Sequence, residues 1–304
     1  MNPQRSLSAR AWIDLLTIAL LWGGSFAAIS VALDGTGPHW IVAWRCLGAF
    51  AILMLYIRLR GLSLPRDGRT WGGFLALGIF NNAVPFTLIT WAEITVPSGL
   101  ASIINASTAI FGVVIAALVF ADERLTPRRL AGVLVGFAGV VIVIGPSLLG
   151  DLDLTSLSQL ALVAAALSYA ASGPIGRRVG RGLAAPVVAA GMLGCSTVVT
   201  ILVALMTEGA PSMPDATGMA AIAYLAVPST AVAYLIYYRL MAVAGAGNTS
   251  LVTLLVAPIA VLLGALMLNE VLPLRAFAGF AAIGVGLLIL DGRILSLFTR
   301  SRPA

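Results

Sequence analysis

Two glutamate residues stand in matching contexts 147 positions apart in the chain, Glu123 and Glu270 (270 − 123). Each follows a long apolar run and precedes a second run that contains regularly spaced glycines. Those glycines align under the same shift, Gly132 and Gly139 with Gly279 and Gly286. The match needs no gap and indicates an internal duplication, which in a membrane protein is typical of transporters.

The composition places the chain in a membrane. Hydrophobic residues make up 60% of it, charged residues 10%, and the mean hydropathy is +1.03, which excludes an ordinary soluble domain. A helix needs about 20 apolar residues to cross a bilayer. Such runs occur at 12–33, 39–57, 71–91, 97–120, 129–146, 157–176, 184–206, 217–238, 247–268 and 274–292. We therefore predict an all-α integral membrane protein with ten spanning helices, the first retained rather than cleaved as a signal peptide.

The basic residues, all of them arginine, predict the orientation. With the N-terminus in the cytoplasm, every arginine except Arg45 and Arg275 falls on the cytoplasmic side, as the positive-inside rule requires. Both termini are then cytoplasmic in a plasma (inner) membrane. Five helices per half give opposite orientations, so we predict two inverted repeats, 1–147 and 148–304, around a central cavity. The pI near 10.0 reflects this topology, and we expect no nucleic-acid partner.

Metal, redox and enzymatic sites have little support in the sequence. The two cysteines, Cys46 and Cys195, lie inside predicted helices, and the single histidine, His39, lies near the outer interface. We expect no metal, no cofactor and no disulfide framework. An intramembrane enzyme is a remote alternative, because no nucleophile has an obvious acid–base partner.

Polar side chains at bilayer depth are costly and usually face the interior of the bundle. Counting inward at about 1.5 Å per residue places a polar and aromatic set close to the midplane. Its members are Trp22, Ser25, Asn81, Asn82, Asn105, Thr108, Tyr169, Ser229 and Thr253. We predict that these residues form the substrate-binding wall. For any one hydroxylated residue, tight helix packing is an equally open interpretation. The amides, which need several hydrogen-bond partners, favour a cavity.

Prolines predict where the helices are interrupted. Pro85, Pro228 and Pro258 lie at a similar depth, and each removes one backbone hydrogen bond. In lipid the freed carbonyl needs another partner, so we expect hinges or breaks that face protein or a wet cavity. Two aromatic residues, Trp91 and Tyr234, are candidates for gating the two mouths of that cavity.

Arg45 lies about six residues inside the second run, near the expected outer mouth. It could snorkel outward, pair with Glu93 or Glu270, or attract a substrate carboxylate, and we favour the first two. On the opposite side, Tyr237 and Tyr238 precede an arginine and are expected in the inner aromatic belt.

The duplicated glutamates, Glu123 and Glu270, each stand just before the next helix. Thr126-Pro127 reads as an N-cap followed by proline in the first helical position. A carboxylate there would complement the helix dipole, so we favour a structural role over a proton relay. The fifth and tenth runs carry glycines but almost no polar side chains in mid-span, so we assign both to close helix packing.

These motifs resemble the drug/metabolite transporter superfamily, specifically its EamA-type branch. The resemblance rests on Leu21-Trp22-Gly23-Gly24-Ser25-Phe26, Arg45, Asp122-Glu123-Arg124-Leu125-Thr126, Ala257-Pro258 and Asn269-Glu270-Val271-Leu272. It spans nearly the whole chain and implies a ten-helix inverted repeat with a central cavity. Within that family the chain looks most like YddG-type amino-acid exporters. One departure is Phe111 in the position equivalent to Pro258, so the two halves should not move identically.

The expected function is transport of a small solute by alternating access. No acidic residue lies at mid-depth, so a site of amides, hydroxyls and aromatic faces suits a neutral or zwitterionic metabolite. We expect amino acids, aromatic and other neutral ones, to leave the cell by an uncoupled or exchange mechanism. The alternative is a proton-coupled exporter of drugs or other metabolites, such as nucleotide sugars or purines. We expect a monomer whose partners are this solute and the lipid bilayer.

Overall fold

The computed structural model describes residues 8–121, 123–153, 156–211, 213–268 and 274–291. Over these ranges the regular structure is entirely helical. The elements are α1 (Ala9–Gly23), α2 (Ser25–Leu33), α3 (Pro38–Leu59), α4 (Gly68–Gly78), η1 (Ile79–Ala83), α5 (Val84–Ala92), α6 (Ser98–Ala106), α7 (Thr108–Val119), α8 (Pro127–Ile144), η2 (Pro146–Asp151), α9 (Leu157–Val179), α10 (Ala185–Thr207), α11 (Ala216–Ala226), η3 (Val227–Val232), α12 (Ala233–Ala244), α13 (Ala246–Thr249), α14 (Val252–Leu268) and α15 (Leu274–Asp291). Of the three η elements, η1 and η3 are π-helical and η2 is a 3₁₀ helix.

Seven helical segments are long and apolar enough to cross a membrane: Ala9–Leu33, Pro38–Leu59, Gly68–Ala92, Ser98–Val119, Leu157–Val179, Ala185–Thr207 and Ala216–Ala244. Two shorter apolar helices, Val252–Leu262 and Leu274–Leu290, fall on the last two predicted runs, and α8 falls on the fifth. The expected all-helical membrane fold is confirmed. The number of crossings and the inverted relation of the halves stay predictions.

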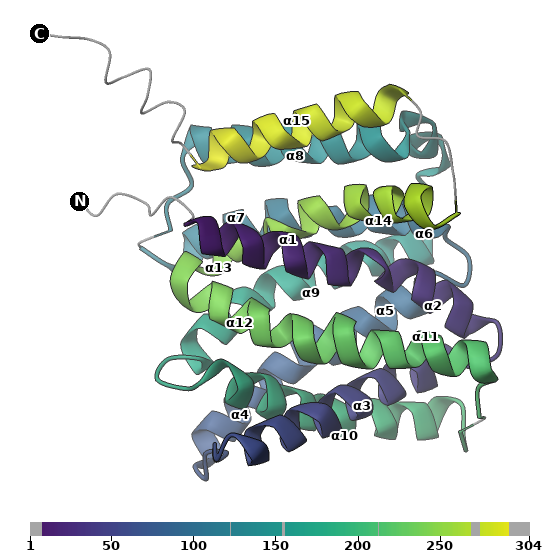
Figure 1. Ribbon diagram of the computed structural model, residues 1–304, viewed down its shortest axis with the longest axis vertical. Helices are drawn as coiled ribbons and strands as arrows, with labels where there is room; N and C mark the ends of the chain where they lie inside the picture. The colour runs from purple at the N-terminus through teal and green to yellow at the C-terminus, as the bar shows by residue number, and fades with distance from the viewer. Residues whose placement is uncertain (1–7, 122, 154–155, 212, 269–273, 292–304) are drawn as a thin grey trace, which may run out of the picture.

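Two pairs of uninterrupted helices lie at the two edges of the bundle, and all the segments interrupted by a break or a π turn lie between them. In Figure 1, α8 and α15 run side by side at the top, and α3 packs with α10 at the bottom. Between these pairs lie α1–α2, α4–α5, α6–α7, α9, α11–α12 and α14. This arrangement puts the irregular backbone in the middle of the protein, where neighbouring side chains can satisfy it.

Glycine lets α8 and α15 touch backbone to backbone. A Cβ atom on Gly286 would lie 2.6 Å from the carbonyl oxygen of Gly132 and 2.6 Å from the amide nitrogen of Gly136. A Cβ atom on Gly139 would lie 2.8 Å from the carbonyl oxygen of Gly279. The aligned glycines of the duplication therefore face one another, which is the close approach expected of small residues between membrane helices.

Gly286→Ala should destabilise the protein by about 1–3 kcal/mol, because the new methyl group must push two backbones apart. The matched control is Gly284→Ala on the same helix, where a Cβ atom meets nothing within 4 Å. That control should gain up to about 1 kcal/mol from the better helix propensity of alanine. Thermal unfolding of the two purified variants in detergent measures the difference. Equal midpoints would contradict backbone contact between α8 and α15.

The loops that contain most of the arginines gather at one end of the bundle. Arg239 near the end of α12 donates through Nε to Asp14 near the start of α1, at 3.1 Å. Arg177 near the end of α9 donates to Glu123, which follows α7, at 2.8 Å. At the other end, Glu208 after α10 accepts the backbone N–H of His39 at 2.9 Å, at the start of α3. The two ends of the bundle therefore differ: arginine side chains pair with carboxylates at one end, and a carboxylate accepts backbone N–H at the other.

Two of the three predicted proline breaks coincide with irregular helix, and the third does not. The helix forms a π turn just before Pro85 and around Pro228. At Pro258, however, α14 continues without interruption. The break in that segment lies instead at Ser250–Leu251, where successive backbone bonds reach only three residues back, from Thr253 to Ser250 and from Leu254 to Leu251. A proline inside a helix loses one bond, whereas this tightened turn redirects the chain.

Candidate functional site

A cavity lies in the middle of the bundle, among helices from both halves of the chain. Its lining includes Trp22, Ser25, Arg45, Asn81, Phe86, Asn105, Thr108, Tyr169, Tyr234, Tyr237 and Thr253. Apart from Arg45 and Ala246, the lining comes from the first, third, fourth, sixth, eighth and ninth predicted runs, the ones whose polar residues pointed to a cavity. Within the described residues, the packing pair α8 and α15 contributes none of the lining.

Aromatic rings form two parts of the wall. Trp22 packs on Tyr237 with ring centroids 5.7 Å apart and meets Tyr234 edge-on at 6.3 Å. Tyr169 meets Phe86 edge-on at 6.4 Å. Trp22 and Tyr169, which the 147-residue shift relates, therefore both reach the cavity. Such walls suit the apolar or aromatic part of a solute.

The amides of η1 are held by one tyrosine hydroxyl. Asn81 donates through Nδ2 to the Tyr234 hydroxyl at 3.0 Å, and that hydroxyl donates to Oδ1 of Asn82 at 2.5 Å. Ser172 donates to Oδ1 of Asn81 at 2.7 Å, and Asn82 donates to Oγ of Ser196 at 2.9 Å. Tyr234 therefore lies at the centre, 2% exposed, and not at a mouth. Asn82 is fully buried behind it and supports the wall without lining it.

The π turn η3 supports the opposite part of the wall. Trp22 donates its indole N–H to the carbonyl oxygen of Ser229 at 2.8 Å, and the hydroxyls of Ser25 and Ser229 share a hydrogen bond of 2.6 Å. Arg45 donates through Nε to the Thr230 hydroxyl at 2.8 Å. Ser229, predicted to bind substrate, is fully buried and is not among the lining residues. A π turn disrupts the regular ladder of backbone bonds, which is why its carbonyl and hydroxyls are available to these side chains.

Arg45 reaches inward and does not snorkel. It is 6% exposed, and its guanidinium carbon lies 3.7 Å from the centroid of the Phe86 ring. Within the described residues it forms no ion pair, and both carboxylate oxygens of Glu93 are buried without a hydrogen-bond partner. The other acid proposed for it, Glu270, lies outside the described residues. Snorkelling is thus replaced by contacts with an aromatic ring and the hydroxyls of η3, whereas pairing with Glu270 stays a prediction.

The break between α6 and α7 presents polar atoms to the cavity. Ser107 interrupts the helix and donates its hydroxyl to the carbonyl oxygen of Ile104 at 2.6 Å. On either side, Oδ1 of Asn105 and Oγ1 of Thr108 are buried without a partner among the described residues. Thr253, across the cavity, satisfies its own hydroxyl on the carbonyl oxygen of Ser250 at 2.8 Å. Asn105 and Thr108 therefore each offer the cavity a polar atom without a partner among the described residues.

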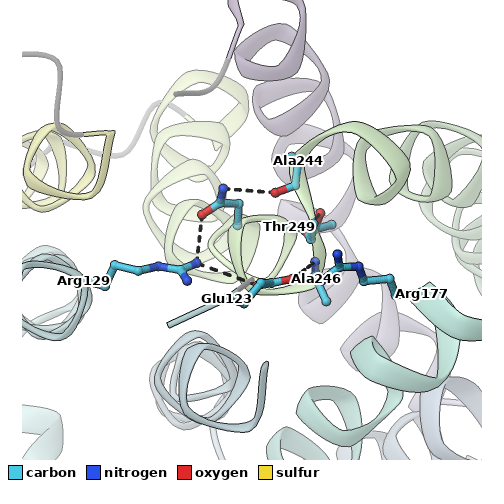
Figure 2. Close-up of polar contacts among 8 residues, drawn as sticks. Glu123, Arg129, Arg177, Ala244, Ala246 and Thr249 are labelled. Carbon is cyan, nitrogen blue, oxygen red and sulfur yellow. Dashed lines mark hydrogen bonds and ion pairs between the residues drawn. The ribbon is translucent and has the colours of Figure 1, made fainter. Parts of the chain in front are cut away.

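Glu123 contacts residues of α8, α9 and α13 at the arginine-rich end (Figure 2). It accepts the backbone N–H of Ala246 at 3.0 Å and N–H of Arg177 at 2.8 Å, and lies 3.9 Å from Arg129. Arg129 also donates to Oδ1 of Asn248 at 3.0 Å. We call this set, Glu123, Arg129, Arg177, Ala246 and Asn248, the clasp. Because Ala246 also lines the cavity, the clasp borders the cavity at this end, which we call its floor.

In the clasp, Glu123 contacts a different helix start from the one expected. Thr126 caps α8 by accepting the N–H of Arg129 at 3.2 Å, with Pro127 in the first turn, so the predicted start of this helix is confirmed. Glu123 instead serves the start of α13, far away in the sequence. Gly245, with φ of 85°, turns the chain so that the N–H of Ala246 points at the carboxylate.

Three aromatic residues lie elsewhere than expected. Tyr237 and Tyr238 are 8% and 5% exposed and so do not form a lipid-facing belt. The hydroxyl of Tyr238 donates to the sulfur of Met192 at 2.9 Å. A π turn adds one residue and rotates the following helix, which moves both rings inward. Trp91 is half-buried at the end of α5 and is not among the lining residues.

Several site residues have weak sequence signals. Phe86 and Tyr237 line the cavity but look like ordinary apolar or interfacial positions. Ser172, Ser196 and Thr230 hold the wall in place from behind. Two of these had a usable signal: Ser172 is related to Ser25 by the 147-residue shift, and Thr230 follows a predicted proline break by two positions.

Known proteins resemble this chain along most of its length. A probable terminal-alkyne amino-acid exporter of Streptantibioticus cattleyicolor is 27% identical over 95% of this chain and 95% of its own. A probable amino-acid metabolite efflux pump of Escherichia coli is 26% identical over 93% of this chain and 95% of its own. One crystal structure matches with a TM-score of 0.78 at 20% identity, covering 94% of this chain and 99% of the other. That likeness concerns the fold.

The family match occurs twice, once in each half of the chain. The model of the EamA-like transporter family matches residues 10–145 and again residues 156–290. Together these matches take in nearly all of the helices that surround the cavity. The protein therefore belongs to the EamA-like transporter family, whose members are multi-pass membrane transporters.

Proposed function

We propose that the protein exports small neutral or zwitterionic metabolites, chiefly aromatic and other neutral amino acids, by alternating access. One observation carries the proposal: the central cavity combines aromatic faces with amide, hydroxyl and guanidinium groups. The names of the two relatives, an amino-acid exporter and an amino-acid metabolite efflux pump, support the same class of solute. We place the protein in the inner membrane with both termini in the cytoplasm, which follows from the arginine distribution.

The transport step itself is proposed to be uncoupled or an exchange. No aspartate or glutamate is among the described residues that line the cavity, so no lining acid is available to carry a proton. One candidate for coupling is Glu93, which is buried and without a hydrogen-bond partner among the described residues. Transport that requires a pH gradient and is lost in Glu93→Gln would favour the proton-coupled alternative instead.

Counterflow in proteoliposomes tests the proposal. The vesicles are loaded with an unlabelled neutral amino acid and challenged with the same amino acid carrying a label, with and without a pH gradient. The wild-type protein should accumulate label in both conditions. Asn81→Ala and Asn105→Ala should lower the initial rate at least about tenfold, since each removes polar contacts worth about 1–3 kcal/mol from the cavity wall.

The matched control is Ser107→Ala, at the same helix break. The hydroxyl that it removes is already bonded to the carbonyl oxygen of Ile104 in the same segment. It should transport at close to the wild-type rate. If both asparagine variants transport normally while folded, the site is wrong. If folded wild-type protein transports no neutral amino acid, the assignment of solute is wrong.

A further inference from the structure

Arg45 is a buried cation with hydrogen-bonding capacity that the protein leaves unused. Its contacts with Thr230 and Ser229, at 2.8 and 3.4 Å, occupy Nε and one hydrogen of Nη2. The Phe86 ring covers one face of the guanidinium. The remaining N–H groups have no hydrogen-bond partner among the described residues, and the residue lines the cavity. Burying a cation is costly unless an anion and hydrogen bonds compensate it.

The same cavity holds acceptors that are equally incomplete. Oδ1 of Asn105 and Oγ1 of Thr108 have no partner among the described residues. The two residues are 8% and 3% exposed, so bulk water does not replace the missing partner. Buried polar atoms nearly always have a hydrogen-bond partner, and exceptions point to an unseen ligand or water. An amide oxygen and a hydroxyl are suitable acceptors for an ammonium group.

We propose that these groups read the two charges of an amino acid: Arg45 binds the α-carboxylate, and Asn105 with Thr108 accepts hydrogen bonds from the α-ammonium group. This inference rests on the proposed function and narrows it. The transported class is then free amino acids with both groups intact, and amides, amines and plain carboxylic acids are excluded. The contacts with Phe86 and with the hydroxyls of η3 orient the guanidinium before the solute arrives.

The aromatic walls account for the third part of such a solute. Trp22 with Tyr237, and Tyr169 with Phe86, offer ring faces and edges to an apolar or aromatic side chain. These contacts tolerate variation in shape, whereas the charged and polar contacts demand particular groups. Selection should therefore be strict for the backbone of the amino acid and loose for its side chain.

Competition with phenylalanine analogues tests the inference in the wild-type protein. The assay uses the labelled neutral amino acid that gives the highest rate of counterflow. Its counterflow is inhibited with phenylalanine, phenylalaninamide, phenethylamine or 3-phenylpropionate. Phenylalanine should compete at least about tenfold better than each analogue, because each analogue lacks one of the two charges that the buried groups of the site would bind. Equal competition by phenylalanine and phenylalaninamide would overturn the role of Arg45.

Variants assign each preference to its residue. In Arg45→Gln the ratio between phenylalanine and phenylalaninamide should fall from at least about tenfold towards one, and in Arg45→Lys part of it should return. Asn105→Leu should instead reduce the ratio between phenylalanine and 3-phenylpropionate. The control is Arg58→Gln, an exposed arginine on the same helix, which should leave both ratios unchanged.

The outcomes separate this inference from the proposed function. Amino-acid counterflow without discrimination against the analogues would support a carrier of neutral solutes. It would refute the proposal that the site binds both charged groups of an amino acid. Absence of any amino-acid counterflow from folded wild-type protein would refute both. Each ratio compares two competing ligands on the same variant. A loss of folded protein lowers both measurements equally and therefore leaves the ratio unchanged.

Discussion

Glu123→Gln is expected to loosen the floor of the cavity and lower transport about tenfold. Glutamine keeps the shape of the side chain and an oxygen for the N–H of Ala246, but removes the charge that faces Arg177 and Arg129. Hydrogen bonds to charged groups contribute about 1.5–3 kcal/mol, and about 1.4 kcal/mol changes an equilibrium constant tenfold. The state with a closed floor, which an alternating-access carrier needs in every cycle, should become rarer.

Cysteine accessibility measures this shift directly. Val252, which lines the cavity and is fully buried, is replaced by cysteine in a background without Cys46 and Cys195. A membrane-impermeant thiol reagent is applied from each side in turn. From the arginine-rich side, Glu123→Gln should raise the labelling rate of Val252→Cys about tenfold.

The matched control is Glu208→Gln. This glutamate also accepts backbone N–H groups at a helix start, those of His39 and Trp40, but at the opposite end of the bundle. It should not change labelling from the arginine-rich side. If Glu123→Gln leaves both labelling and transport at wild-type rates, the clasp is a static contact and does not control access to the cavity.

Tyr234→Phe is expected to destabilise the protein by about 1–3 kcal/mol and to impair transport strongly. The substitution removes one hydroxyl that both accepts from Asn81 and donates to Asn82. Oδ1 of the fully buried Asn82 then loses that partner, and an unsatisfied buried acceptor costs roughly this amount. Because the same amides belong to η1, the π turn before Pro85, the helix break should lose its defined geometry.

Tyr237→Phe is the matched control for stability. Tyr237 lies on the same helix and lines the same cavity, but its hydroxyl forms no hydrogen bond with the described residues. Thermal unfolding of both purified variants should show a lower midpoint for Tyr234→Phe alone. The second measurement is the expression level, which for Tyr237→Phe should equal that of the wild-type protein. Equal midpoints for the two variants would show that the amides find other partners.

The class of fold could be predicted because its signals are local. Runs of apolar residues predict membrane helices, since crossing the bilayer sets both their length and their hydropathy. The start of α8 could be predicted from Thr126-Pro127, because a cap acts within one helical turn. The aligned glycines pointed to close packing because only a missing side chain permits backbone contact, as between Gly286 and Gly132.

The helix breaks could be predicted only in part. Pro85 and Pro228 mark π turns, yet Pro258 lies in continuous helix, and the real break at Ser250–Leu251 has no proline. A proline removes one backbone hydrogen bond. Whether the helix bends there depends on which partners the neighbouring helices provide for the freed carbonyl. Each π turn also rotates the residues beyond it, which brought Tyr237 to the cavity.

The amino-acid sequence by itself determined a duplicated, all-helical membrane protein of a transporter family and which of its helices carry polar residues. Only the tertiary structure decided their partners: Arg45 contacts Thr230 and Phe86, and Glu123 contacts Ala246 across more than a hundred residues. Hydropathy and periodicity depend on neighbours within a few helical turns, so they can be recognised from the sequence alone. A buried charge, in contrast, takes whichever partner the packing of distant helices brings within hydrogen-bonding distance.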